Sequence, residues 1–245
     1  MLVSFLLLLS ASLAPPFVSA AAFDFKQFQF HEPKDTDSRS PCPVMNTFSN
    51  HGIFPRNGLS LTRPMLQDAF MKVLNLDAAF SAMVANMSNP FLHPDGKFDL
   101  HDLARHNVIE HDASMTRDDA APGETFAPVP TNTTKVELVL AVSADGVRFT
   151  EDDFALAKSI LERSLTTPLG ALQAPADAES PLILSTFGAA QKDGSLAMSV
   201  QALRNVFKIN RFPDGFVAPK TPVSPAVIGA SLTRFLARKK VLDAL

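Results

Sequence analysis

Residues 40–52 read SPCPVMNTFSNHG and hold the only cysteine of the chain, Cys42. Pro43 has a backbone torsion suited to the first position of a helix, where its missing N–H would have been unpaired anyway. Gly52 suits the position just after a helix ends. The stretch therefore predicts a helix that starts at Pro43, ends before Gly52 and has Cys42 as its N-cap. The sulfur then faces unpaired backbone N–H groups and the positive end of the helix dipole, which together favour a thiolate.

A lone cysteine has three interpretations. It can be a small buried hydrophobic residue, which is the ordinary fate of a free cysteine. It can form a disulfide between two chains, or its thiolate can have a chemical role. A soft anionic sulfur at a helix N-terminus suits a transition metal, and haem iron in particular. The residues around Cys42 do not by themselves decide between burial and chemistry.

The bulk composition indicates one domain of moderate size. The chain has 245 residues, of which 46% are hydrophobic, enough to form one sizeable core. Aromatic packing has to come from the 20 Phe, because Trp and Tyr are absent. The net charge is −3, so nothing indicates a nucleic-acid partner, which usually requires a basic face.

The N-terminal segment is typical of a signal peptide covering residues 1–20. Its apolar run from Leu2 to about Ala14 is too short to span a bilayer, and two prolines end it. Residues 18–20, VSA, provide the small side chains that a signal peptidase requires. No Lys or Arg precedes the run, so an uncleaved membrane anchor is the alternative.

We therefore expect a secreted protein with no stable membrane insertion after cleavage. Residues 21–36 are expected to form an extended N-terminal arm, and residues 37–245 one folded domain. Two sequons, at Asn86 and Asn132, are compatible with a glycoprotein of the secretory pathway.

Hydrophobic periodicity predicts a mostly α fold. Capping signals support three of the expected helices: Thr62 before one, Thr150 with Asp153 before another, and Ser224 followed by Pro225 before the last. Residues 135–142 alternate briefly like a strand, although tertiary context could make them helical. The expected helices cover residues 62–76, 77–87, 98–108, 150–165, 180–190, 195–210 and 224–242.

A second polar stretch, IEHDAS, covers residues 109–114. It can be the solvated end of a helix, which is the commoner case. Alternatively, the Glu110 carboxylate, a backbone carbonyl and the Ser114 hydroxyl are oxygen donors that suit magnesium or calcium. His111 beside Asp112 could then be an oriented imidazole in an acid–base relay.

A third candidate is Glu179, which precedes an expected helix capped by Ser180 and begun by Pro181. A carboxylate in this position commonly complements the helix dipole. It can instead lie over an apolar cavity, where its pKa would rise to a value useful in catalysis.

Taken in order, these stretches resemble the haem-thiolate peroxidases of fungi, the family of chloroperoxidase and the unspecific peroxygenases. The resemblance runs from about Asp37 to Phe216 and rests on two separated motifs. The residues that match the proximal signature and the Glu-His-Asp-x-Ser signature are Pro41, Cys42, Pro43, Asn46, Asn50, His51 and Gly52, then Glu110, His111, Asp112 and Ser114.

The resemblance implies a single compact, mostly α domain of the chloroperoxidase type that encloses haem b. Cys42 would be the axial ligand of the iron, and Pro41, Pro43 and Asn50 would belong to the cofactor-binding loop. The resemblance also implies a Mg²⁺ or Mn²⁺ ion held against a haem propionate. Its ligands would be Glu110, the backbone carbonyl of His111, and Ser114.

The resemblance further makes Glu179 the distal acid–base, with His111 orienting it and Asp112 holding His111. This match is positional, and Asp177 is the closest competitor.

Hydrogen peroxide and a small organic substrate would react through a ferryl intermediate. A haloperoxidase or peroxidase on the same scaffold, or a non-catalytic secreted haem-binding protein, is the alternative. Ile109 and Leu182 suggest an aliphatic pocket, which favours oxygen transfer over halide oxidation.

Overall fold

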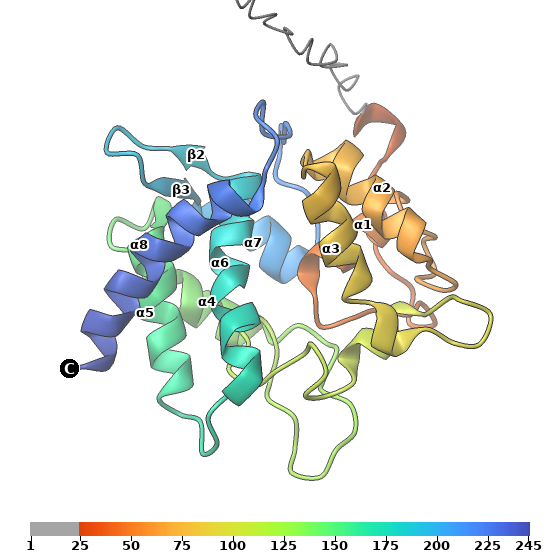
Figure 1. The fold of residues 1–245 in the computed structure, drawn as a ribbon, viewed down its shortest axis with the longest axis horizontal. Helices are drawn as coiled ribbons and strands as arrows, with labels where there is room; N and C mark the ends of the chain where they lie inside the picture. The colour runs from red at the N-terminus through yellow and green to blue at the C-terminus, as the bar shows by residue number, and fades with distance from the viewer. Residues whose placement is uncertain (1–24) are drawn as a thin grey trace, which may run out of the picture.

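The computed structural model describes residues 25–245 (Figure 1). The predicted signal peptide lies outside the described residues, as does the beginning of the predicted arm. Within the described part of the arm, a short 3-10 helix, Phe25–Gln27, is followed by irregular chain.

The described chain is mostly helical, which confirms the predicted fold class. The α-helices are α1 (Pro43–His51), α2 (Arg63–Leu74), α3 (Ala78–Asn86), α4 (Thr133–Leu140), α5 (Glu151–Glu162), α6 (Gln173–Phe187), α7 (Val200–Arg204) and α8 (Pro225–Asp243). Three short antiparallel strands, β1 (Arg148–Thr150), β2 (Ala189–Ala190) and β3 (Leu196–Ser199), form a sheet in the order β1-β3-β2. A π-helical segment, Asn205–Ile209, continues α7.

The helices form two groups on either side of the molecule (Figure 1). The first group contains α1, α2 and α3, and α2 packs against α3. The second contains α4 to α8 with the small sheet, and α8 packs along both α5 and α6. Long irregular connections between residues 105 and 132 link the two groups.

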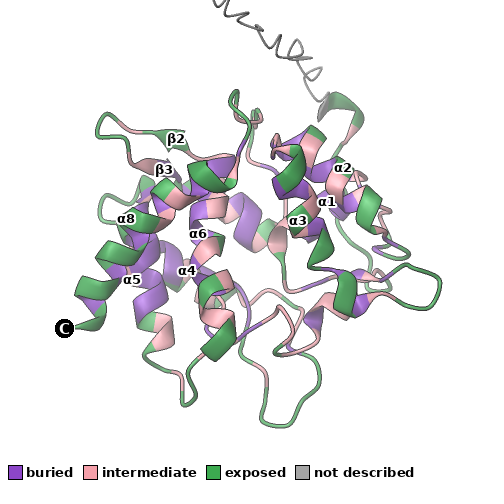
Figure 2. Ribbon diagram, viewed as in Figure 1, coloured by how far each residue is buried: buried purple, intermediate pink, exposed green. Residues whose placement is uncertain are grey.

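Each group has its own hydrophobic core, and the helices turn their buried faces toward it (Figure 2). The first core contains Phe48, Phe54 and Phe98, and the second contains Phe149 and Phe154, all fully buried. Partly buried Val44 and Phe187 contact both cores. The boundary between the cores therefore lies close to the start of α1 and to α6.

Three predicted helix starts are confirmed by their caps. Thr62 Oγ1 accepts the N–H of Met65, and Ser224 Oγ accepts that of Val227. Before α5, Thr150 and Asp153 form the reciprocal capping box that satisfies two otherwise unpaired N–H groups.

Several predicted segments differ from the structure, including residues 98–108, of which only Leu100–Ala104 form a short 3-10 helix. Residues 135–142 belong mainly to α4, because Val136, Val139 and Leu140 fall on one helical face and are buried together. Residues 195–210 do not form one helix: Leu196–Ser199 is the central strand of the sheet, and helix begins only after Ser199, whose hydroxyl caps α7.

Another difference concerns α6, which begins at Gln173 rather than at Pro181. Pro181 is buried inside the helix, where it cannot donate the hydrogen bond to the carbonyl of Asp177. Glu179 therefore projects from the middle of a helix and is not at the helix start.

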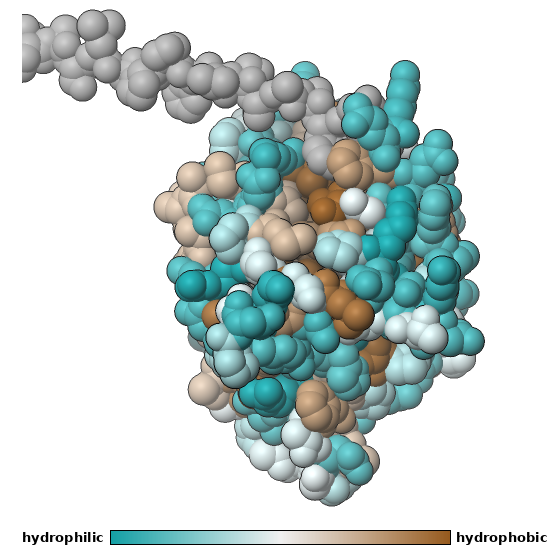
Figure 3. Space-filling view, turned by 90° about the vertical axis from the view of Figure 1, so that its right-hand side faces the viewer, coloured by the Kyte–Doolittle hydropathy of each residue, from teal (hydrophilic) through white to brown (hydrophobic). Residues whose placement is uncertain are grey.

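The surface features agree with a folded domain that is polar outside. None of the described helices is both long and apolar enough to span a membrane. Hydrophobic side chains on the face shown in Figure 3 form separate patches among hydrophilic ones. Of the two sequon residues, Asn86 is exposed at the end of α3 and Asn132 is the N-cap of α4.

Candidate functional site

Cys42 is the N-cap of α1, as predicted, with extended backbone torsions (φ −80°, ψ 113°). Pro43 is the first helical residue, and Gly52 ends the helix in the left-handed region (φ 76°). The structure records no cap hydrogen bond to the sulfur. The Cys42 thiol is free and exposed.

The pKa of the Cys42 thiol is raised, although the helix start was expected to lower it. Burial is the strongest influence and raises the pKa, while the N–H groups of Met45 and Val44 lower it by a smaller amount. The negative charge of Glu179 raises the pKa further. The sulfur is accessible to solvent, and the charge of Glu179 acts on it, so the two side chains lie near each other.

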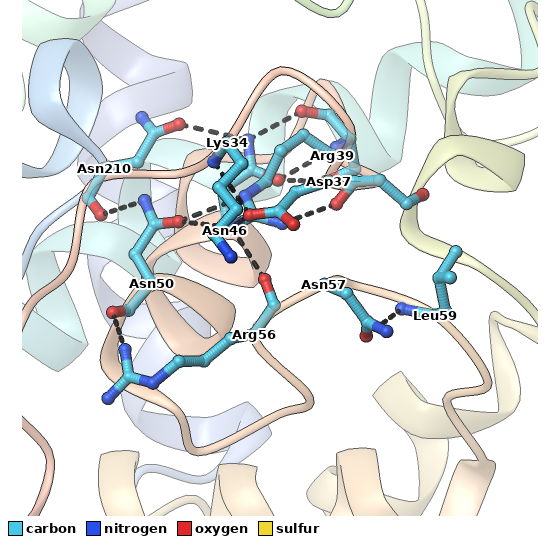
Figure 4. Close-up of polar contacts among 11 residues, drawn as sticks. Lys34, Asp37, Arg39, Asn46, Asn50, Arg56, Asn57, Leu59 and Asn210 are labelled. Atoms are coloured by element: carbon cyan, nitrogen blue, oxygen red, sulfur yellow. Dashed lines mark hydrogen bonds and ion pairs between the residues drawn. The ribbon is translucent and has the colours of Figure 1, made fainter.

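Asn46 holds the loop that carries Cys42 (Figure 4). Its Oδ1 accepts the N–H of Ser40 at 2.8 Å, and its Nδ2 donates to the carbonyl of Ser40, also at 2.8 Å. Nδ2 also donates to Oδ1 of Asn210 at 3.0 Å. Asn46 is buried, so this clamp is shielded from water and fixes the entry of the chain into α1.

Asn50 extends the same network and is also buried. Its Oδ1 accepts from Nε and Nη2 of Arg39 at 3.0 and 2.8 Å, and its Nδ2 donates to the carbonyl of Asn210 at 3.0 Å. Asn50 thereby ties α1 to Arg39 before the cysteine and to Asn210 after α7.

His51 belongs to the scaffold. Nδ1 donates to the carbonyl of Phe28 at 2.7 Å, and Nε2 accepts the N–H of Phe212 at 3.3 Å. This pairing requires a neutral ring, since only a neutral imidazole has an accepting nitrogen. Burial lowers the pKa of His51 and maintains that state.

In the second motif, Glu110 lies beside a histidine that the sequence did not single out. His106 Nδ1 is 2.7 Å from Oε2 of Glu110, and burial raises the pKa of Glu110. Ligand atoms of His106, Glu110 and Asp112 all lie within 4.8 Å of one another. Among described His, Cys, Asp and Glu side chains, this is the group that could share one metal ion.

The chain turns sharply after Asp112. Ala113 is buried and left-handed (φ 58°), and Asp119 Oδ1 accepts its N–H at 2.9 Å. The Asp112 carboxylate accepts the N–H of Ala120 at 3.1 Å. Ser114 Oγ accepts from the N–H of Arg117 at 3.2 Å. Strained backbone of this kind persists where the surroundings fix it, and it is common at functional sites.

The structure brings the side chains of His111 and Glu179 together. Nε2 of His111 lies 3.5 Å from Oε1 of Glu179. His111 is buried, and its Nδ1 bonds the carbonyl oxygen of Asp112 at 2.6 Å. Asp112 therefore contacts His111 through its backbone, whereas its carboxylate is engaged with Ala120.

The charges of His111 and Glu179 stabilise each other. Burial acts to raise the pKa of Glu179, but hydrogen bonding from His111 and the charges of His111 and Lys158 outweigh it and lower the pKa. For His111, burial lowers the pKa, and Glu179 outweighs burial and raises it. The Glu179 side chain is 63% exposed, so its carboxylate is accessible to solvent.

Asp177, the competing acid, points elsewhere. Both its carboxylate oxygens accept from Nε2 of Gln173 at 3.1 Å, and Lys239 of α8 is 3.8 Å away. Asp177 is buried between helices, and no contact with His111 is recorded for it. Of the two acids, Glu179 is the one placed to work with His111.

Arg117 was not among the candidate residues predicted from the sequence. It is 1% exposed, its Nε has no hydrogen-bond partner among the described residues, and its charge acts on the Cys42 sulfur. Its place three residues after Ser114 was the available signal. An arginine in a loop is usually exposed, which is why sequence alone does not single it out.

Comparison with known proteins gives consistent matches. A sequence model of the family described as "Peroxidase, family 2" matches residues 28–221. The chloroperoxidase of Leptoxyphium fumago is 32% identical over 110 residues, covering 41% of this chain and 29% of the relative.

Two proteins named aromatic peroxygenase also match. The one from Cyclocybe aegerita is 28% identical over 223 residues, covering 77% of this chain and 57% of the relative. The one from Coprinellus radians is 35% identical over 102 residues, covering 34% and 39%. The matched part thus covers between 29% and 57% of the length of these relatives.

Proposed function

The chain belongs to peroxidase family 2, and from that premise we propose that it is a secreted haem-thiolate peroxygenase. It would use hydrogen peroxide to oxygenate or oxidise small organic substrates. The observation that carries the proposal is the pairing of an accessible cysteine sulfur with the His111–Glu179 pair. The charge of Glu179 acts on the Cys42 sulfur, and His111 lies 3.5 Å from Glu179, so the three groups lie near one another.

The residues around Cys42 and Glu179 fit haem. Cys42 offers an accessible thiol with no disulfide partner, the kind of soft ligand that iron takes in haem-thiolate proteins. Partly buried Val44, Ile109 and Leu182 pack against the first core and supply apolar contacts. A raised thiol pKa does not oppose this use, because a metal replaces the thiol proton and binds the thiolate directly.

Cys42 would hold the iron, with Pro41, Pro43 and Asn50 as part of the cofactor-binding segment. The fixed position of the start of α1 supports that assignment, since Asn46 bonds the backbone of Ser40 and Asn50 bonds Arg39 and Asn210. Haem, when bound, supplies the redox chemistry, and a thiolate ligand favours heterolysis of the O–O bond.

Glu179 and His111 would carry out the proton transfers. An ionised Glu179 carboxylate would accept a proton from one oxygen of hydrogen peroxide and return it to the other, which is the proton transfer that release of water requires. The electrons for O–O cleavage and the acceptor of the remaining oxygen atom would be supplied by the haem. His111 stabilises the carboxylate before and after the transfer, since its Nε2 faces Oε1 of Glu179. The low pKa of Glu179 suits this role, because the base has to be ionised when peroxide arrives.

Glu110 would hold a hard cation such as Mg²⁺ or Mn²⁺, together with the His111 carbonyl and Ser114. Support comes from the burial of the Glu110 carboxylate, which raises its pKa and which a cation would offset. The neighbouring His106 and Asp112 offer further ligand atoms. The aliphatic side chains of Ile109 and Leu182 favour oxygen transfer to apolar substrates over halide oxidation.

The thiolate ligand can be tested by spectroscopy. The protein is purified with haem supplied, reduced and exposed to carbon monoxide. We expect a red-shifted, thiolate-type Soret band that is lost in Cys42→Ala. Ser49→Ala is the matched control, because Ser49 is buried in the same helix and its hydroxyl has no recorded partner. A histidine-type spectrum in the unaltered protein, or an unchanged band in Cys42→Ala, would overturn the proposal.

A further inference from the structure

Arg117 is a buried positive charge that lacks a carboxylate partner within residues 25–245. Nη1 donates to the carbonyl oxygen of Thr116 at 3.2 Å, and Nε has no partner. Burial lowers the pKa of Arg117 to about 10, so the guanidinium is still charged at neutral pH. A buried charge without an opposite charge is costly, which indicates that an anionic group binds here.

The backbone of Arg117 is hydrogen-bonded through both its N–H and its carbonyl. Its N–H donates to Oγ of Ser114 at 3.2 Å, and its carbonyl accepts from Nζ of Lys135 at 2.6 Å. Thr116, the preceding residue, is buried, and its carbonyl accepts the N–H of Asn132 at 2.9 Å. The backbone around Arg117 is thus fixed, and its side chain is buried.

The position of Arg117 links it to the proposed haem site. Its charge acts on the sulfur of Cys42, and it shares a turn with Ser114 at the proposed cation site. The thiolate itself is not the anion that needs Arg117. A ferric iron, a doubly deprotonated porphyrin and one thiolate together carry no net charge. The carboxylates of haem b are its two propionates, which extend from one edge of the ring.

We propose that Arg117 binds one haem propionate, as a positioning residue for the cofactor. This inference rests on the proposed haem site. Arginine binds carboxylates through parallel N–H groups, and the free Nε is one of the donors available for such a pair. If the cation near Glu110 takes the other propionate, both haem carboxylates have a positive partner, and the charge of Glu110 is balanced as well.

The test measures haem retention rather than turnover. Haem and haem dimethyl ester, whose carboxylates are neutral, are bound separately to the protein, and their transfer to an excess of a haem scavenger is timed. In the unaltered protein, esterification is expected to speed loss strongly. In Arg117→Met, native haem is expected to leave at least about tenfold faster, while the ester leaves at nearly its former rate. Arg117→Lys is expected to restore part of the difference.

Arg211→Met is the matched control. Arg211 also has an Nε without a partner among the described residues, but its Nη2 is paired with Asp214 at 2.6 Å. Its replacement is expected to leave the effect of esterification unchanged. If Arg117→Met speeds the loss of haem and ester by the same factor, or of neither, Arg117 does not bind a propionate and the inference is overturned.

The carbon monoxide spectrum separates this failure from failure of the proposed function. If the unaltered protein shows the thiolate band but esterification acts equally in all variants, only the inference fails. If the unaltered protein shows no thiolate band, the proposed function itself has failed. Should Arg117→Met not fold, Arg117→Lys keeps the charge and gives the same comparison with a smaller expected effect.

Discussion

Nε2 of His111 lies 3.5 Å from Oε1 of Glu179, across the boundary between an irregular loop and the middle of α6. The other ring nitrogen, Nδ1, lies 2.6 Å from the carbonyl oxygen of Asp112. A carbonyl can only accept, so Nδ1 carries a proton and Nε2 is the nitrogen that faces the carboxylate. Each group favours the charged form of the other: the pKa of His111 is raised and the pKa of Glu179 is lowered.

The first prediction concerns Glu179→Gln. The variant is expected to bind haem and to show the thiolate spectrum, because Glu179 does not hold the cofactor in the proposed site. Its rate of peroxide turnover is expected to fall by about 10²- to 10⁴-fold, since an amide cannot accept the peroxide proton. Steady-state turnover at saturating peroxide measures the effect.

Asp177→Asn is the control for Glu179→Gln, because the Asp177 carboxylate contacts Gln173 and Lys239 and has no recorded contact with His111. Its turnover is expected to stay close to that of the unaltered protein. Retained turnover in Glu179→Gln, with loss in Asp177→Asn, would exchange the roles of the two acids.

The position of Glu179 shows what the sequence could and could not predict. Its place after a Pro/Ala-rich segment suggested a carboxylate in front of a helix, because proline commonly begins helices. In the structure the helix starts at Gln173 and includes Pro181, since packing of α6 against α8 and α5 stabilises the extra turns. The role of this acid remains a prediction, and its local environment depends on contacts distant in sequence.

Helix α1 is the opposite case. Proline at its first position, glycine after its end and a cysteine between prolines are local signals, and the structure has the helix where they placed it. The partners of Asn46 and Arg117 could not be predicted in this way. Asn46 bonds Asn210, which is far along the chain, and the burial of Arg117 follows from the path of the whole 105–132 connection.

A second prediction tests the clamp on the cysteine loop. Asn46→Ala removes two hydrogen bonds to the backbone of Ser40 and one to Asn210, and it leaves those buried groups without partners. The free energy of unfolding is expected to fall by about 2–4 kcal/mol. Urea unfolding of the purified protein measures it.

Asn57→Ala is a matched control, since its Oδ1 accepts a single exposed N–H from Leu59 at 3.2 Å. We expect a change of less than about 0.5 kcal/mol there. Equal effects of Asn46→Ala and Asn57→Ala would show that the clamp does not stabilise the loop.

A third prediction concerns the cation. Added Mg²⁺ or Mn²⁺ is expected to raise the melting temperature of the haem-loaded protein, and removal by a chelator is expected to reverse the increase. Glu110→Gln should lose this response without destabilising the metal-free protein, because the buried carboxylate is already disfavoured there, as its raised pKa indicates. Thermal unfolding with each ion measures the response.

Glu137→Gln is the control for the cation experiment. Glu137 lies on α4 and is paired with Arg204 and Lys208, away from the second motif. It should retain the full response to the ion. A response that persists in Glu110→Gln would place the cation, or its effect, at other residues.

The last prediction is a pH dependence of stability that arises at His51. Burial lowers the pKa of His51 in the folded protein below the value of 6.5 that is usual for histidine. As the pH falls through that value, the unfolded chain binds a proton that the folded protein does not, so stability is complete above it and decreases below it. Urea unfolding at pH 7.5 and pH 5.5 is expected to show this loss, and His51→Asn to show less of it while being less stable at both pH values. His31→Asn, at an exposed side chain, should keep the slope of the unaltered protein. An equal slope in His51→Asn and the unaltered protein would mean that the buried imidazole does not couple folding to protons, and the neutral ring bonded between Phe28 and Phe212 would have to be reassigned.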